Sequence, residues 1–223
     1  MANYIATDTD LGAVADAIRN KGGTSADLVF PGGFVDAIDA IETGGGAPSA
    51  DDYAQKNVPS GLVRISVSPI TQAAFWWCKN ITGVVIDVAC TINENAFRNC
   101  NAMAFFVSQY NTTLNAGTTV SYNSNLLTID INTSTINKSL SFTGNSKLTA
   151  LVLRRTSSIT TVTQTNAFNG SKSTTKPIHV YVPSALKSTY EAATNWSTWV
   201  ADGTIIFEDL EGSIYESEDW WES

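Results

Sequence analysis

Histidine and paired carboxylates are the side chains on which most hydrolases rely, and this chain offers few of them. His179 is the only histidine, and it lies in the alternating segment 179–182, where a structural role is favoured over catalysis. The acidic residues between positions 53 and 187 are Asp87, Glu94 and Asp130. A glycosidase needs two carboxylates about 5 to 10 Å apart, and Asp87 and Asp130 make a poor pair because they are about two repeats apart. No nucleophile-elbow, zinc-protease or phosphate-loop spacing occurs in the sequence, so we expect a protein that is not an enzyme.

The cysteines give no sign of a metal or disulfide framework. Cys78, Cys90 and Cys100 are odd in number, and no two of them are spaced as CxxC. A single histidine adds little to a possible zinc site. We therefore expect three small buried side chains, no metal and no cofactor.

Repeats are the most specific pattern in the chain. The apolar segments 81–86, 103–108, 126–131 and 148–153 align with starts 22, 23 and 22 residues apart. A second ladder accompanies them, in which an aromatic residue is followed three positions later by a small one, at Phe75, Phe97, Phe142 and Phe168. The coil over 111–125 lacks this aromatic. A period of this length predicts a solenoid, whose coils bury their apolar edges by stacking.

The strand of each coil should alternate in direction. Ile81, Val84 and Ile86 are expected to point inward. The outward positions then form three columns: Gly83, Phe105, Thr128 and Ala150; Val85, Val107, Asp130 and Val152; and Asp87, Gln109, Asn132 and Arg154.

This outward face is the expected binding surface, since solenoid faces commonly bind partners. Trp76 and Trp77 are expected to lie at a coil bend, one facing in and one out, with capping of the first coil or stacking on a sugar as alternatives. The apolar outward positions fit contact with a neighbouring chain equally well. The residues expected to contact a glycan or cell-wall polymer are Phe105, Gln109, Asp130, Asn132, Arg154, Arg155 and Trp76.

Charge divides the chain into three regions. Residues 1–52 hold nine acids and two bases, residues 53–187 hold three acids and eleven bases, and residues 188–223 hold nine acids and no base. The basic middle suits an anionic surface, although strands rich in Ser, Thr and Asn also simply carry few acids. It has no basic stripe or nucleic-acid motif, so we expect no nucleic-acid partner.

Neither a membrane span nor an export signal is predicted. The sequence has no apolar run of about 18 residues, and its first residues lack a basic and apolar leader. The acidic aromatic tail, 211–223, is either a docking peptide for a basic partner, including a neighbouring subunit's repeats, or a frayed terminus.

The first 43 residues predict two short helices joined by a turn, followed by a flexible linker over 44–58. Each apolar stripe is too short to be stable alone, which favours self-association. The residues expected to mediate oligomerisation or attachment are Leu11, Val14, Ile18, Phe30, Phe34, Ile38 and Ile41.

Two resemblances add to this pattern. The sequence Ile81-Thr-Gly-Val-Val-Ile86 followed by Thr91-Ile-Asn-Glu-Asn-Ala-Phe-Arg-Asn-Cys100 resembles the BspA-type leucine-rich repeat, and segment 179–196 resembles the strand and helix that close such repeats. Residues 7–41, with Leu28-Val-Phe-Pro-Gly-Gly-Phe34, are similar to an N-terminal module of phage and prophage tail or fibre proteins.

The expected fold is therefore mainly β. It comprises a helical module (1–43), a linker (44–58), a leucine-rich-repeat-like solenoid of period 22–23 with its C-terminal cap (59–210), and the acidic tail (211–223). The helical module is called the head below. The resemblance of its residues 7–41 implies a virion location, other tail or capsid proteins as partners, and a homo-oligomer, a trimer by analogy with fibres. The function expected is adhesion to a bacterial surface polymer or glycan. The alternatives are a capsid fibre or decoration protein without a receptor role, and a bacterial surface leucine-rich-repeat adhesin.

Overall fold

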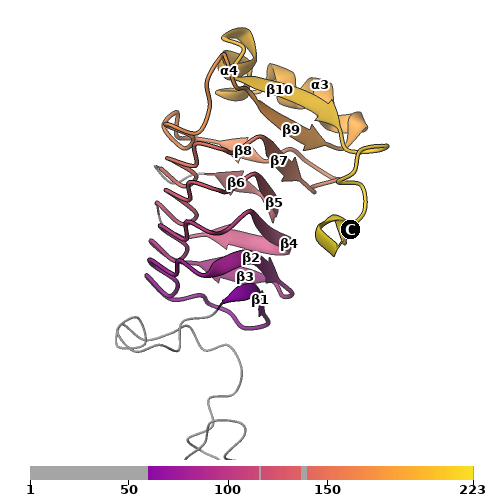
Figure 1. The fold of residues 1–223 in the computed structure, drawn as a ribbon. Helices are drawn as coiled ribbons and strands as arrows, with labels where there is room; N and C mark the ends of the chain where they lie inside the picture. Colours follow the sequence, from indigo (N-terminus) through magenta and orange to yellow (C-terminus); the bar gives the residue numbers. More distant parts are fainter. Residues whose placement is uncertain (1–59, 116, 137–139, 223) are drawn as a thin grey trace, which may run out of the picture. The chain divides into compact units, whose positions relative to one another are not determined.

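The computed structural model describes residues 60–115, 117–136 and 140–222 (Figure 1). The chain divides into two units, Met1–Gly46 and Ala47–Ser223, and all described residues belong to the second. The expected helical module, its oligomerisation residues and the whole expected linker lie outside the described residues. Among the described residues no helix is long and apolar enough to cross a membrane.

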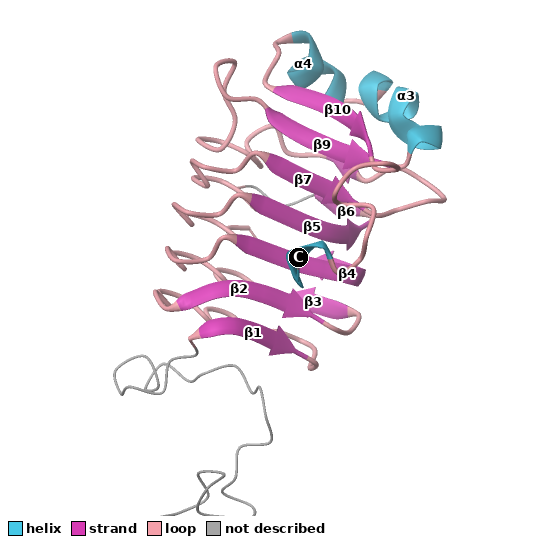
Figure 2. Cartoon of the chain, turned by 45° about the vertical axis from the view of Figure 1, so that its right-hand side comes forward, coloured by secondary structure: helices cyan, strands magenta, loops and turns pink. Residues whose placement is uncertain are grey.

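The described residues form a parallel β-solenoid, which confirms the mainly β prediction. Seven strands lie side by side in the main sheet (Figure 2). Their order is β1 (Gly61–Ile65), β2 (Ile81–Ile86), β4 (Phe105–Leu114), β5 (Thr128–Thr133), β7 (Ala150–Leu153), β9 (Ile178–Val182) and β10 (Ile205–Asp209). The short strand β3 (Cys90–Ile92) also belongs to this sheet, where it pairs with the end of β4, and β6 (Thr135–Ile136) and β8 (Thr161–Val162) form a separate two-stranded sheet.

Strand register confirms the repeat length. Gly83 pairs with Phe105, Phe105 with Thr128, and Thr128 with Ala150, so successive partners are 22, 23 and 22 residues apart. Each coil thus adds one rung to a parallel sheet, and its hydrogen bonds go to the rungs above and below.

The core lies between the sheet and the turns that return each coil. Ile81, Val84 and Ile86 are buried in this core, as predicted, although Ile81 is out of step with the alternation that Val84 and Ile86 follow. The aromatic ladder is present as well: the rings of Phe75 and Phe97 stack with centroids 4.9 Å apart, and those of Phe142 and Phe168 lie 5.5 Å apart.

The third coil keeps its geometry although it lacks the ladder aromatic. Val120 occupies the position and is fully buried. The backbone N–H of Phe97 donates to Thr119 O at 2.8 Å, and that of Val120 donates to Ser141 O at 3.1 Å, so the hydrogen bonds between coils continue unbroken. An aliphatic side chain therefore suffices to fill this level of the core.

A buried polar ladder runs beside the aromatic one. Asn123 Oδ1 accepts the backbone N–H of Cys100 at 2.7 Å, and Asn145 Oδ1 accepts that of Asn123 at 2.9 Å. Ser171 Oγ accepts the N–H of Asn145 at 2.8 Å. Side chains thus satisfy backbone groups that the tight turns leave without a backbone partner.

The turns place residues in the left-handed region in two columns, the first of Ala73, Asn95, Thr118 and Leu140 and the second four residues later in each coil. The positions with positive φ in the second column are Trp77, Asn99, Tyr122, Gly144 and Gly170, with φ between 58° and 71°. This conformation corrects the expectation that Trp76 and Trp77 face opposite ways: both side chains are exposed, because the left-handed backbone at Trp77 turns its side chain away from the core.

The last coil is closed by β9, β10 and two helices, α3 (Ser184–Ala192) and α4 (Trp196–Ala201) (Figure 1). Trp196 and Tyr190 are fully buried, and Trp199 meets the ring of Phe168 edge-on with centroids 5.5 Å apart. The helices therefore cover the ladder end, where a further coil would otherwise stack.

Candidate binding surface

Strand pairing places two of the three expected outward columns as predicted. Gly83, Phe105, Thr128 and Ala150 lie in register, and so do Val85, Val107, Asp130 and Val152. Arg64 and Tyr181 extend the second column at its two ends. The column thus runs across the face with a cation at one end and a phenol at the other.

The outward face is covered by the chain's own C-terminal segment. After β10 the chain returns to the level of β4 and β5 and ends beside them in a short 3-10 helix, η1 (Trp220–Glu222) (Figures 1 and 2). Residues 211–222 are called the tail below. Val85, Val107 and Val152 are buried although they point away from the core. Of the two expected states of this segment, docked and frayed, the described tail is docked. The basic region on which it docks, within residues 53–187, belongs to the same chain.

A buried ion pair lies beneath the tail. The side chain of Asp130 is fully buried and that of Arg154 is 10% exposed. Arg154 donates from Nε to Asp130 Oδ1 at 3.0 Å and from Nη2 to Oδ2 at 2.7 Å. Gln109 Nε2 and Trp220 Nε1 also donate to Oδ2, at 2.8 and 2.9 Å. The carboxylate therefore has its charge and its hydrogen-bonding capacity satisfied within the protein.

The same side chains hold the tail backbone. The guanidinium of Arg154 donates to the carbonyls of Tyr215, Glu216 and Ser217, at 2.7, 3.3 and 3.1 Å. Gln109 Nε2 donates to Glu218 O at 3.0 Å. The tail is thus recognised mainly through its main chain, by a guanidinium that the Asp130 carboxylate has already oriented.

Charged groups anchor both ends of the tail. Arg64 Nη2 lies 2.6 Å from Glu222 Oε1, and Arg64 Nη1 lies 3.3 Å from Asp87 Oδ1. At the other end Glu211 accepts the backbone N–H of Ser184 at the start of α3, a hydrogen bond that lowers the pKa of the Glu211 carboxyl.

Aromatic rings fill the space between tail and sheet. Trp220 meets Phe105 edge-on at 5.8 Å, and Tyr215 packs on Tyr181 at 4.7 Å. Burial raises the pKa of Tyr181, and the nearby Tyr215 and Glu208 raise it further. The Phe105 ring in turn lies over Gly83, where an added Cβ would stand 2.3 Å from the ring. A glycine is therefore needed at this position for the ring to support Trp220.

The third expected column is wrong at one step, the pairing of Gln109 with Asn132. The pairing of β4 with β5 shifts between Ser108 and Asn111, so Asn132 lies opposite Asn111 and not opposite Gln109. The β-bulge turns Tyr110 out to solvent. Bulges of this kind redirect side chains on a strand, and here the shift separates Gln109, under the tail, from Asn132, outside it.

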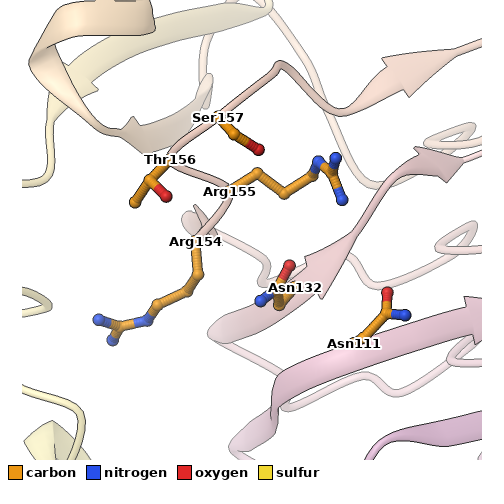
Figure 3. Close-up of a pocket in the computed structure, with 6 residues that line it drawn as sticks. All are labelled: Asn111, Asn132, Arg154, Arg155, Thr156 and Ser157. Carbon is orange, nitrogen blue, oxygen red and sulfur yellow. The ribbon is translucent and has the colours of Figure 1, made fainter.

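Beside the tail-covered face lies a polar pocket of about 290 Å³ (Figure 3). Its lining residues are Asn111, Asn132, Arg154, Arg155, Thr156 and Ser157. The guanidinium of Arg155 lies on the same side of the pocket as the two asparagines, whereas that of Arg154 points away from them (Figure 3). Arg155 donates from Nε and Nη2 to Ser158 Oγ, at 3.3 and 2.6 Å. The two consecutive arginines therefore serve different surfaces.

The sequence-predicted binding residues separate into three places. Phe105, Gln109, Asp130 and Arg154 meet under the tail, whereas Asn132 and Arg155 meet in the pocket. Trp76 lies in the turn before β2 and not on the strand face. His179 projects from the strand face at the far end of the sheet, where its Nδ1 lies 2.9 Å from Glu208 Oε1.

Sequence reasoning missed Asn111, Tyr215 and Trp220. The composition of the tail carried the relevant signal, because an acidic aromatic segment complements a face that holds Arg64 and Arg154. The bulge that exposes Asn111 lies within β4, which has ten residues beside partners of six.

Within the described part of the chain, no group of three or more His, Cys, Asp or Glu side chains is arranged to hold a metal ion. Comparison with known proteins gave no match to a family model, to a curated protein or to a solved structure.

Proposed function

We propose that this protein is a virion structural protein of the phage tail or fibre class, which attaches through its N-terminal module and presents the solenoid to a bacterial surface glycan or cell-wall polymer. Its coils are proposed to be of the BspA-like leucine-rich-repeat class. The observation that carries the adhesion part of this proposal is the polar pocket around Arg155 and Asn132, which stays open beside a strand face that the tail has closed.

The state of the carboxylates supports binding over turnover. Asp130 is fully buried and accepts hydrogen bonds from three side chains, and Asp87 is paired with Arg64. A general acid or nucleophile needs access to its substrate, and Asp130 lies under the tail without it.

The virion part of the proposal rests on the resemblance of residues 7–41 to the N-terminal module of tail and fibre proteins. A displayed adhesin gains from several copies, because linked weak sites bind a surface tightly. The proposed assembly is a homo-oligomer, with a trimer favoured, held by the apolar stripes of the head and joined to other virion proteins.

Two measurements on the full-length chain test this proposal. Light scattering gives its mass, and a fluorescent form is tested for binding to a panel of bacterial cells. An oligomer that labels particular strains supports a receptor-binding fibre. An oligomer that labels none contradicts the receptor role and favours a fibre or decoration protein.

A second chain that starts at residue 47 locates the interface. It should be a folded monomer if the head drives assembly. A truncated chain that still forms oligomers would move the interface to the solenoid and contradict the proposed role of the head.

A further inference from the structure

We infer that the pocket formed by Asn111, Asn132 and Arg155 binds a single acidic sugar unit, one that carries a carboxylate or a phosphate among its hydroxyls. The inference rests on the proposed adhesion function and names the ligand class of its site.

The pocket is lined by polar groups with spare hydrogen-bonding capacity. Among the described residues, the amides of Asn111 and Asn132 and the hydroxyls of Thr156 and Ser157 make no hydrogen bond to another protein group, and Arg155 bonds only Ser158. Amides offer both donors and acceptors, and hydroxyls do the same. A ring with several hydroxyl groups is the ligand that such a mixed set matches.

The β-bulge in β4 presents Asn111 to the pocket. The bulge in β4 is held from inside by the buried hydroxyls of Ser108 and Thr112, whose oxygens lie 2.7 Å apart. Thr112 Oγ1 also lies 2.8 Å from the carbonyl of Tyr110. The bulge is therefore a supported feature of the fold that sets Asn111 opposite Asn132 on the next strand.

Charge selects an anionic ligand. No acidic residue lines the pocket, and the neighbouring carboxylate of Asp130 is already paired with Arg154. Within the described part of the chain, Arg155 has no ion-pair partner, so its positive charge is not neutralised locally. A guanidinium is planar and binds carboxylate or phosphate in a two-pronged manner.

Size limits the ligand to one sugar at a time. Sites for drug-sized molecules have volumes of about 300 to 1,000 Å³, and this pocket, at about 290 Å³, lies just below that range. A longer chain of sugars would place one acidic unit in the pocket and run past exposed Tyr110.

The test measures binding of the full-length chain to three immobilised glycans: an oligogalacturonate, its methyl ester, and a mannose-6-phosphate polymer. The methyl ester keeps every ring and removes only the charge. We expect binding to one or both acidic forms and at least about tenfold weaker binding to the ester, as loss of a charged hydrogen bond implies. Binding to the galacturonate alone identifies the carboxylate as the source of the anion, and binding to the phosphate polymer alone identifies the phosphate.

Two variants tie the binding to the pocket. Arg155→Gln removes the cation, and Asn132→Asp places a negative charge beside it; each should weaken binding to the acidic glycan about tenfold or more. Lys147→Gln is the matched control, because it removes one exposed positive charge outside the pocket. Thermal unfolding of each variant checks that the solenoid remains folded.

The outcomes separate failure of the acidic-sugar pocket from failure of the adhesion proposal. Equal binding of the ester, or unchanged binding by Arg155→Gln and Asn132→Asp, overturns the acidic-sugar pocket. If cells are labelled while none of the three glycans binds, the pocket inference fails and the adhesion proposal stands. If neither cells nor glycans are bound, both fail.

Discussion

Asp130 and Arg154 are 24 residues apart in sequence and face each other on neighbouring rungs of the sheet, joined by a two-pronged ion pair of 3.0 and 2.7 Å. The pair is a bridge between repeat and tail, since Arg154 also donates to three tail carbonyls. Each coil is stabilised by its neighbours, whereas the tail is stabilised by side chains from several coils at once. The ion pair therefore couples the stability of the solenoid to the closure of its outer face.

Arg154→Gln should strongly destabilise the protein. It leaves the Asp130 carboxylate buried without its cation, a change that costs about 3 to 5 kcal/mol when one partner of a buried pair is removed. Chemical denaturation followed by circular dichroism measures the loss. Arg155→Gln is the control for position, because the next arginine in the chain has no buried partner, and its free energy of unfolding should change by less than about 1 kcal/mol. Equal effects of the two substitutions would show that the pair contributes nothing specific.

Removal of the tail should make the protein associate with itself. A chain that ends at Leu210 uncovers Val85, Val107 and Val152, the apolar positions of the outward column that the tail now covers, and exposed apolar patches mark sites of association. Light scattering over a concentration series measures the change. Glu222→Gln is the control, since it removes only an exposed ion pair worth about 1 kcal/mol or less. A truncated chain with the mass of the full-length protein at every concentration would contradict this role for the tail.

The repeat and its inward positions could be predicted from the sequence because they depend on local alternation and on a period that four segments share. Ile81, Val84 and Ile86 were identified in this way. The turns were harder: the sequence predicts that Trp76 and Trp77 differ in exposure, and a left-handed backbone at Trp77 overrides simple alternation. Such a conformation is uncommon for a bulky residue and leaves no periodic mark.

The candidate site was only partly predictable, because two of its determinants act over a distance. The tail returns to residues about 60 to 160 positions earlier in the chain, which no local pattern encodes. The bulge at Tyr110 changes the register by insertion, so that Asn132 meets Asn111. The sequence places Arg154 and Arg155 on one surface, whereas in the structure the guanidinium of Arg154 holds the tail and that of Arg155 faces the pocket.

Gly144→Ala should destabilise the solenoid more than Gly170→Ala. Both glycines have positive φ, 69° and 71°, so both substitutions incur about 1 to 2 kcal/mol for a left-handed non-glycine residue. Only at Gly144 does a new Cβ approach a ring, at 2.6 Å from Tyr122 Cδ1, whereas at Gly170 the nearest atom is 3.7 Å away. The difference between the two free energies of unfolding therefore isolates the contact with Tyr122. Equal losses would mean that the ring moves away at no cost.

The thiols should react only after unfolding, and they should make stability fall at alkaline pH. Burial raises the pKa of Cys100 and of Cys90 above the ordinary value of 9.0. In the unfolded chain these thiols ionise near pH 9, while in the folded protein they stay protonated. Their contribution is therefore fully present below pH 9 and is lost as the pH rises above it. Titration with a thiol-reactive chromophore at pH 8, with and without denaturant, checks the reactivity, and denaturation midpoints from pH 7 to 10 check the sign. Rapid labelling of the native protein, or a midpoint that increases above pH 9, would contradict the buried state.

Asn145→Ala should be among the most damaging substitutions of a polar residue in the solenoid. The Asn145 side chain is fully buried; its Nδ2 donates to the carbonyls of Val120 and Phe142, both at 2.9 Å, and its Oδ1 accepts the N–H of Asn123. The substitution leaves the Val120 carbonyl and the Asn123 N–H without these partners, at about 1 to 3 kcal/mol each, whereas the Phe142 carbonyl keeps the Ser171 hydroxyl, so we expect a loss of about 2 kcal/mol or more. Asn125→Ala is the matched control, because Asn125 is exposed, and its bonds to the carbonyl of Asn101 and from Lys147 Nζ can be replaced by water. Asn145→Ser should fall between the two, since a serine, Ser171, fills this position of the ladder in the next coil toward the C-terminal cap and there satisfies one N–H and one carbonyl. If Asn145→Ala costs no more than Asn125→Ala, the polar ladder is dispensable, and the aromatic ladder with the strand hydrogen bonds is enough to hold the coils in register.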